Sequence, residues 1–250
     1  SLRYQNATEM LKDLSLALKR PNDDFVVLAS RNDNSPTQKV PTIYELEMEK
    51  NNDKNAPKMG DATHKDGKFV KKDNLELMKD YATTISHISN IPMDVHLMVE
   101  NVEEIMDEYI DLAPDRITFH IEAIKDNERV LNIIKELREN GIKVGIAISP
   151  DTDVEEVKPF LEKINMVLVM TVVPGNGGQK LIPETIEKIK NLRKYADENS
   201  IDIDIEADGG INAETAEEVR MAGADILVSG AYIVNSEEPR DAVNLLKGRI

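Results

Sequence analysis

The sequence predicts an α/β protein built as a (β/α)8 (TIM) barrel of parallel strands. From about residue 73 onward, short β-branched segments alternate with longer segments of helical periodicity, which is typical of a parallel sheet covered by helices. The chain has 250 residues, and one such barrel takes roughly 250. We therefore expect one domain over residues 1–250, with residues 1–22 as a candidate N-terminal helical extension.

Six strands are expected after residue 90, namely Met93–Val99, Asp115–Ile121, Lys143–Ser149, Met166–Val172, Ile201–Ala207 and Asp225–Ser229. The expected helices are Asn74–Ile88, Val102–Leu112, Asn127–Asn140, Thr152–Leu161, Pro183–Asn199, Ala213–Ala222 and Pro239–Leu246. Thr152 and Glu155 form a predicted capping box, and Pro183 suits a first helical position. Gly141 and Gly223 are suited to end their helices in a left-handed conformation.

The first two βα units of the barrel are expected to be irregular. Phe25–Ala29 suits a strand, and Leu11–Lys19 has the pattern of an amphipathic helix ahead of it. The second strand should lie near Met59–His64, yet this segment contains few residues that favour strands. An open, doubly wound sheet is therefore the alternative fold.

Composition and charge narrow the classes of ligand. The formal net charge is −16, whereas a protein that binds nucleic acid or an anionic membrane would carry a basic surface, so we expect neither partner. A few local N–H groups suffice to bind a phosphate, so a phosphorylated small molecule stays open. The chain has no cysteine, which excludes disulfides and a thiolate nucleophile. Ser1–Tyr4 show no signal-peptide pattern, so we expect a cytoplasmic protein.

One expected strand, Met93–Val99, carries polar side chains on a single face. The period of two places Asp94, His96 and Met98 together, and the apolar alternate residues suit packing on helices. The polar face would then point into the barrel. An imidazole among carboxylates suits a metal ion, and a hydrogen-bonded core histidine is the alternative.

A second polar column consists of Asp204, Glu206 and Asp208. Three stacked carboxylates repel one another unless a bound cation, or a proton held at a raised pKa, compensates them. The alternative is an edge strand whose polar face lies in water. Asp208 is the strongest functional candidate, because it ends its strand directly before Gly209 and Gly210.

Glycines follow three of the expected strands, at the end where barrels of this type hold their active sites. Such loops bring backbone N–H groups close to a ligand, and those after the last two strands commonly hold a phosphate. The glycine-loop residues expected to line a ligand are Gly175, Gly177, Gly178, Gly209, Gly210, Gly230 and Ala231. His120 and Glu122 end another strand, where they would either line the mouth of the barrel or cap the next helix.

Several segments together resemble the ribulose-phosphate 3-epimerase family. The resemblance spans about residues 66–250, and its specific elements are HLMV at His96–Val99 and PGxGGQ at Pro174–Gln179. The segments that carry it are Asp94–Val99, Thr118–Ala123, Gly145–Thr152, Val169–Gln179, Asp208–Asn212 and Ala222–Asp225.

The resemblance implies an isomerase that converts D-ribulose 5-phosphate to D-xylulose 5-phosphate by proton transfer at carbon 3, through an enediolate. It implies one divalent metal ion (Zn, Fe, Mn or Co) and two carboxyl groups on opposite sides of the substrate. By this match the metal ligands are His64, Asp66, His96 and Asp208, and the proton carriers are Asp208 and Asp66. The match adds Ser30, Met98 and Met170 to the residues that line the substrate. We expect a small sugar phosphate as ligand and a homo-oligomeric assembly.

The second strand departs from the family pattern His-x-Asp-x-Met-Asp-Gly-x-Phe-Val. Aligned without a gap, Asp61 and Thr63 occupy the positions of the first histidine and aspartate; with three residues deleted, His64 and Asp66 supply both. Two alternatives therefore stay open beside the epimerase, namely an epimerase of a hexulose 6-phosphate and a sugar-phosphate-binding barrel with impaired catalysis. A decarboxylating barrel with the same phosphate-binding loops is a third.

Overall fold

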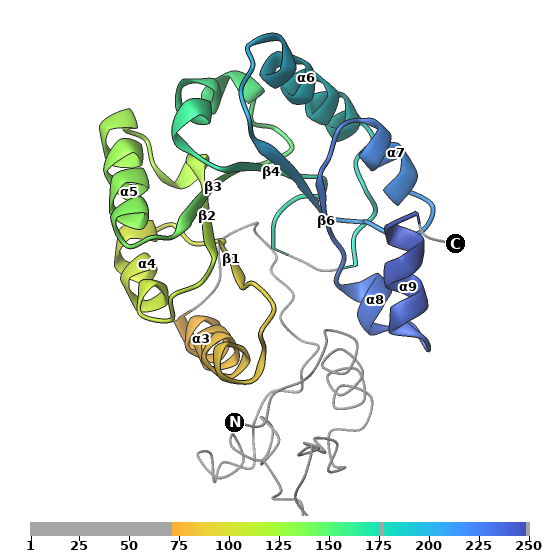
Figure 1. Cartoon of the computed structure of the whole chain (residues 1–250), viewed down its shortest axis with the longest axis horizontal. Helices are drawn as coiled ribbons and strands as arrows, with labels where there is room; N and C mark the ends of the chain where they lie inside the picture. Colours follow the sequence, from red (N-terminus) through yellow and green to blue (C-terminus); the bar gives the residue numbers. More distant parts are fainter. Residues whose placement is uncertain (1–71, 176–177, 249–250) are drawn as a thin grey trace, which may run out of the picture.

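A computed structural model describes residues 72–175 and 178–248, which form a curved parallel β-sheet with helices along one side of it (Figure 1). The strands are β1 (Asp94–Leu97), β2 (Arg116–His120), β3 (Lys143–Ile148), β4 (Met166–Met170), β5 (Asp204–Asp208) and β6 (Ile226–Val228). Each strand pairs in parallel with the next one along the chain. All six predicted strands after residue 90 are thus confirmed, five with shorter bounds and β5 with shifted bounds.

The α-helices are α3 (Lys72–Ile88), α4 (Val102–Ile110), α5 (Asn127–Glu139), α6 (Glu184–Glu198), α7 (Ala216–Met221), α8 (Ala231–Val234) and α9 (Pro239–Leu246). The described residues also form three 3-10 helices, which are η1 (Ile121–Ala123), η2 (Val154–Glu156) and η3 (Lys158–Lys163). No helix within the described ranges is both long and apolar enough to span a bilayer.

The sequential strand order decides between the two folds that the sequence left open. The order is β1-β2-β3-β4-β5-β6, as in the wall of a barrel. A doubly wound sheet instead reverses its strand order and carries helices on both faces. The described part is therefore of the barrel type. The expected elements before residue 72, including residues 1–22, Phe25–Ala29 and Met59–His64, lie outside the described residues.

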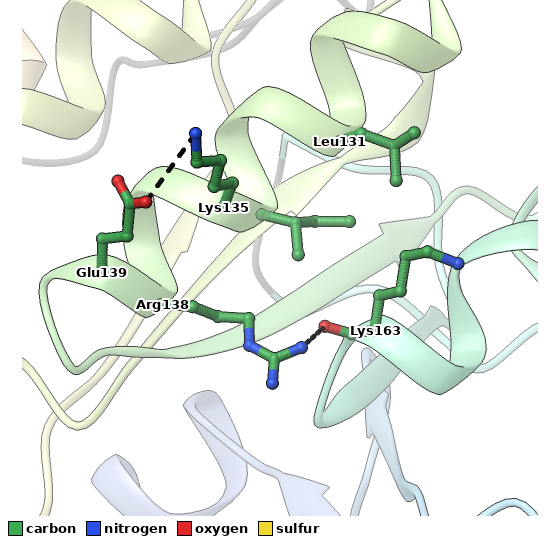
Figure 2. A pocket seen from close by; sticks show the side chains of 6 residues that line it. Leu131, Lys135, Arg138, Glu139 and Lys163 are labelled. Atoms are coloured by element: carbon green, nitrogen blue, oxygen red, sulfur yellow. Dashed lines mark hydrogen bonds and ion pairs between the residues drawn. The ribbon is translucent and has the colours of Figure 1, made fainter.

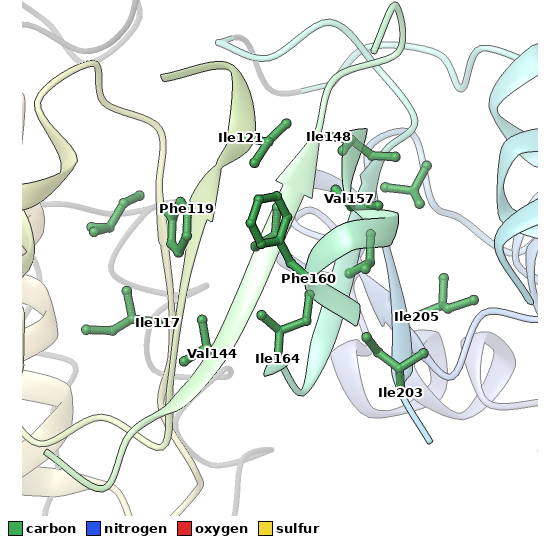
Figure 3. Packing of buried hydrophobic residues seen from close by; sticks show 14 of the residues in the cluster. Ile117, Phe119, Ile121, Val144, Ile148, Val157, Phe160, Ile164, Ile203 and Ile205 are labelled. Atoms are coloured by element: carbon green, nitrogen blue, oxygen red, sulfur yellow. The ribbon is translucent and has the colours of Figure 1, made fainter. Parts of the chain in front are cut away.

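The main core lies between the sheet and the helices. Side chains of Phe119, Val144 and Ile205 leave the strands on this outer side and belong with Phe160 of η3 to one core cluster, and all four are at most 2% exposed (Figure 3). Burying each such side chain contributes about 1.5–3 kcal/mol. The inner side has a smaller apolar cluster, made of Ala147, Met166, Leu168, Met170 and Val172. Alternate residues of the strands thus face opposite sides of the sheet, as their period of two predicted.

The prediction of a helix over Thr152–Leu161 is wrong. The segment forms η2 and η3 instead, with Pro159 at the start of η3. Proline has no N–H and its ring collides with the carbonyl four residues earlier, so it destabilises an α-helix that would continue through it. The predicted capping box is also wrong, because Asp153 Oδ1 accepts the Glu155 N–H (3.0 Å) and the Thr152 hydroxyl donates to Glu122.

Two other predicted boundaries differ from the observed ones. The strand expected at Ile201–Ala207 begins only at Asp204 and ends at Asp208. The helix expected from Ala213 begins at Ala216, because the Asn212 side chain accepts the N–H groups of Glu214 (2.8 Å) and Thr215 (3.2 Å) and so closes a turn first.

Gly145→Ala should destabilise the fold by about 1–3 kcal/mol, because a Cβ at Gly145 would lie 2.2 Å from Thr118 Oγ1 on the neighbouring strand. Urea unfolding measures the free energy. Among the described residues, Thr118 Oγ1 is buried without a hydrogen-bond partner, so Thr118→Ala can serve as the relieving change. The double variant should lose less stability than the sum of the two single variants; strict additivity would contradict the predicted clash.

Candidate functional site

The polar residues predicted to share one face do point to the inner side of the sheet, at the carboxyl ends of the strands. His96 lies on β1, His120 ends β2 and Asp208 ends β5. Met170 ends β4 directly opposite Asp208 in the register of the two strands. In barrels of this type the active site forms at this end, so the candidate site is where the fold predicts it.

His96 and Asp208 meet across the inner side of the sheet. His96 Nδ1 lies 3.8 Å from Asp208 Oδ2, and both side chains are largely buried. Burial lowers the pKa of His96, and the nearby Asp208 opposes this effect only in part. The imidazole is therefore neutral at neutral pH, which is the form that binds metal ions.

The pair is suitable as part of a metal site. Nitrogen and oxygen ligands bind a divalent ion such as zinc at about 2.0–2.2 Å, so two ligand atoms of one ion lie at most about 4 Å apart. The His96–Asp208 distance of 3.8 Å satisfies this limit. Residues 72–175 and 178–248 contain no group of three or more potential ligands. The other two expected ligands, His64 and Asp66, lie outside the described residues, as does Ser30.

His120 and Glu122 form a hydrogen-bonded pair behind His96. His120 Nε2 lies 3.0 Å from His96 Nε2, and the two rings are stacked with centroids 5.0 Å apart. His120 Nδ1 lies 3.0 Å from Glu122 Oε2. The sequence left open whether these residues line the mouth or cap a helix; Glu122 caps none of the described helices, and its carboxylate faces His120 and the loop after β3.

The pKa of Glu122 lies at about 2. Burial by itself raises it, but hydrogen bonds from His120, from the Ser149 N–H and from the Thr152 hydroxyl outweigh burial because they stabilise the anion. Glu122 is therefore a carboxylate throughout the physiological range.

The acidic column on β5 is compensated by a residue that the sequence analysis did not single out. Arg116 at the start of β2 contacts carboxylate oxygens of Asp94 (3.0 Å), Asp204 (3.2 Å) and Glu206 (3.7 Å). The alternative of a solvated edge strand is wrong for this column, because Glu206 is only 4% exposed. The period of two, which aligns Arg116 with His120, was the signal that could have found it.

Glu206 is the member of the column that holds a proton. Burial raises its pKa to about 8, repulsion by Asp94 adds to this, and Arg116 opposes it. Of the two forms of compensation expected from the sequence, the raised pKa is the one found here, and the Arg116 side chain acts beside it.

The glycines after β5 are required by the backbone. Gly209 and Gly210 have φ of +124° and +65°, where other residues are strained. A Cβ would lie 2.4 Å from Val172 at Gly209 and 2.3 Å from the Leu181 nitrogen at Gly210. The β5 loop is therefore packed tightly against the segment after β4.

Three other glycines of the predicted loops, Gly175, Gly178 and Gly230, are less crowded by the described residues. Gly175 and Gly178 have φ of +123° and +75°, and a Cβ at either position, or at Gly230, would meet no atom of the described residues within 4 Å. Gly177 lies outside the described residues. The space around these glycines is thus compatible with a bound ligand, and their role in binding stays a prediction.

A groove on the outside of the molecule is separate from this site. It is lined by Leu131, Ile134, Lys135, Arg138 and Glu139 of α5 and by Lys163 of η3 (Figure 2). Arg138 donates to the Lys163 carbonyl (3.1 Å), and Lys135 pairs with Glu139 (3.8 Å), so much of its charge is already compensated. None of the candidate site residues lines it.

Comparison with solved structures defines the class of fold. The chain is similar to 3-hexulose-6-phosphate synthase from Salmonella typhimurium (TM-score 0.51, 18% identity, 70% of this chain and 81% of that chain). It is also similar to 3-keto-L-gulonate-6-phosphate decarboxylase from Vibrio cholerae (TM-score 0.53, 12% identity, 68% and 78%). At these identities the likeness shows the fold alone, that of (β/α)8-barrel enzymes.

Sequence relationships identify the family within this class. The model of the ribulose-phosphate 3-epimerase family matches residues 50–234. The ribulose-phosphate 3-epimerase of Methanocaldococcus jannaschii is 40% identical over 182 residues (73% of this chain, 75% of the relative), and that of Escherichia coli is 34% identical over 176 residues (70% and 74%). The chain belongs to the ribulose-phosphate 3-epimerase family, a family of isomerases whose members generally depend on a metal ion.

Glu206→Gln should make the free energy of unfolding less dependent on pH. The pKa of Glu206 is about 8 in the folded protein and about 4.3 in an unfolded chain, so between these values only the folded protein holds the proton. Stability from this group is therefore full below the lower pKa and is lost as the pH rises through 8, by on the order of a few kcal/mol.

Urea unfolding in EDTA at about pH 5 and about pH 8 measures this effect. The matched control is Glu103→Gln, which removes a carboxylate that pairs with Arg129 on the surface. Glu206→Gln should lose less stability than wild type on going to the higher pH, and the control should follow wild type. Equal pH dependence in all three proteins would contradict the raised pKa.

Proposed function

We propose that this protein epimerises D-ribulose 5-phosphate and D-xylulose 5-phosphate at carbon 3, using one divalent metal ion. The observation that carries the proposal is the approach of His96 and Asp208, at 3.8 Å, on the inner side of the sheet in a member of this family. The two residues come from β1 and β5, so strands that are not neighbours in the sheet bring a carboxylate beside a neutral imidazole.

Each side chain has a defined task in this proposal. Asp208 removes the proton at carbon 3 on one face of the substrate, and Asp66 returns one on the other face. His96, Asp208, His64 and Asp66 hold the metal ion. When bound, the ion (Zn, Fe, Mn or Co) would supply positive charge that stabilises the developing enediolate. Without such stabilisation, a carboxylate is too weak a base to remove a proton next to a carbonyl.

The substrate is positioned by the loops around Asp208. The proposed phosphate-binding and substrate-lining residues are Ser30, Met98, Met170, Gly175, Gly177, Gly178, Gly209, Gly210, Gly230 and Ala231. Met170 lies opposite Asp208 in the strand register, which supports its place at the wall of the site. Backbone N–H groups in such loops suit a phosphate even in a chain of net charge −16, because binding depends on local donors.

Two alternative functions would use the same site. A hexulose 6-phosphate differs from the pentulose phosphate by one carbon, and the site residues named above do not distinguish the two sugars. A binding barrel with impaired catalysis would result if His64 and Asp66 did not reach the site. A cytoplasmic location and a homo-oligomeric assembly stay predictions from the sequence.

Proton exchange in D2O tests the proposal directly. Ribulose 5-phosphate is incubated with the metal-reconstituted protein, and NMR follows loss of the carbon-3 proton and appearance of the xylulose epimer. Exchange with epimer formation supports the proposal. Thermal stabilisation by the sugar phosphate without any exchange would instead favour the binding barrel.

Asp208→Asn should lower turnover by about 10²- to 10⁴-fold or more, because it removes a proton carrier and preserves the shape of the side chain. The matched control is Asp202→Asn, at an exposed position just before β5. Steady-state kinetics and far-UV circular dichroism should show a folded, inactive Asp208 variant and an active control. Near-normal turnover of Asp208→Asn would overturn its assignment.

His96→Ala should weaken metal binding, because it removes one of the proposed ligands. The metal content after dialysis, measured by atomic emission, should fall from about one ion per chain in wild type. His87→Ala, at an exposed position of α3, is the control. Unchanged stoichiometry in the His96 variant would identify His96 as a core residue that binds no metal.

A further inference from the structure

A continuous chain of hydrogen bonds leads from the candidate metal site to the loop between β3 and η2. His96 Nε2 contacts His120 Nε2 (3.0 Å), and His120 Nδ1 contacts Glu122 Oε2 (3.0 Å). Glu122 Oε1 accepts the Ser149 N–H (2.7 Å) and the Thr152 hydroxyl. The proposed function uses only the first residue of this chain.

The outer end of the chain is held rigidly. Lys188 of α6 donates to the carbonyl oxygens of Ser149 (3.0 Å), Pro150 (2.7 Å) and Thr152 (2.5 Å). The same short segment thus receives three bonds from one ammonium and gives two donors to Glu122. This arrangement leaves the Glu122 carboxylate in one place, facing His120.

The direction of each hydrogen bond follows from what a carboxylate can do. An ionised carboxyl group only accepts, so His120 Nδ1 must carry the hydrogen that it shares with Glu122. In a neutral imidazole the other nitrogen then has no hydrogen, so His120 Nε2 accepts. His96 Nε2 must therefore donate, which leaves the lone pair of His96 on Nδ1, the atom that faces Asp208 at 3.8 Å.

We propose that His120 and Glu122 are positioning residues that fix the tautomer of His96, so that its Nδ1 is free of hydrogen and directed at the metal ion. The proposal rests on the proposed function, because it assigns that nitrogen as the ligand atom. In this arrangement Glu122 orients His120, and His120 orients His96, the residue that would hold the ion. Partners of this kind typically change metal affinity by about 10- to 100-fold when they are removed.

The opposite arrangement has a distinct signature. A doubly protonated His120 would donate to both neighbours, His96 Nε2 would accept, and the His96 hydrogen would lie on Nδ1, where it would block a metal ion. The two arrangements differ in which nitrogen of His96 carries the hydrogen, and NMR observes this directly.

The first experiment measures the tautomer of His96 in the wild-type protein. Long-range proton–nitrogen correlation spectra of the ¹⁵N-labelled, metal-free protein distinguish protonated from unprotonated ring nitrogens. The chain has four histidines, and the spectrum of His96→Ala identifies the signals of His96. We expect a protonated Nε2 and an unprotonated Nδ1 at neutral pH. A hydrogen on Nδ1 of His96 would overturn the proposal.

The second experiment measures the affinity for Zn2+ alone, by competition with a chelator. Glu122→Gln keeps the size of the side chain but presents an amide that can donate to His120 Nδ1, so it should bind Zn2+ about 10- to 100-fold more weakly. Glu103→Gln is the control, because it makes the same change of charge at the surface, where Glu103 pairs with Arg129. Turnover of Glu122→Gln should recover as the metal concentration rises, whereas a purely structural role would leave it low.

The outcomes separate this proposal from the proposed function. One outcome is that the wild type binds Zn2+ through His96 while Glu122→Gln binds it equally well with an unchanged His96 tautomer. In that case the positioning role of His120 and Glu122 is wrong, and the proposed epimerase site stands. If the wild type binds no metal through His96, the proposed site is wrong. If Glu122→Gln does not fold, the tautomer measured in the wild type still decides the proposal.

Discussion

The alternation of side chains along each parallel strand is the constraint on which this structure depends. One side of the sheet faces helices and is apolar, as Phe119 and Ile205 show, and the other side is released from that packing. Polar groups can then gather on the inner side at little cost to the main core. The candidate site occupies the carboxyl ends of the strands on this side, where His96 and Asp208 approach each other.

The inner side contains two electrostatic systems along the strands. At the start of β2, Arg116 contacts three carboxylates, and Glu206 holds a proton because its pKa is raised. Toward the ends of the strands, His120 and Glu122 connect His96 to the neighbouring loop. The first system reduces the acidic charge near the start of the strands, because Arg116 faces the carboxylates there and Glu206 is protonated at neutral pH.

Much of this arrangement could be predicted from sequence, and the rest depends on contacts that no local pattern encodes. Period-two alternation placed Asp94, His96 and Asp208 on the inner side, and the six strands followed from their β-branched segments. The partners of Arg116 and Glu122 depend on strand register and on where a loop folds back. The helix expected around Pro159 failed because the proline breaks a segment whose apolar spacing suits a helix. The contributions of His64 and Asp66 lie beyond the described residues.

The anchoring of the loop after β3 has a consequence for how this region can vary. Lys188 binds carbonyl oxygens, and every amino acid has one, so the anchor makes no demand on the side chains at Ser149 or Pro150. Ser149 likewise binds Glu122 through its backbone N–H. Only Thr152 takes part through its own hydroxyl. The side chains of this loop at the rim of the barrel could therefore change while the bonds that hold its backbone stay the same. Such changes could alter which ligands the barrel prefers.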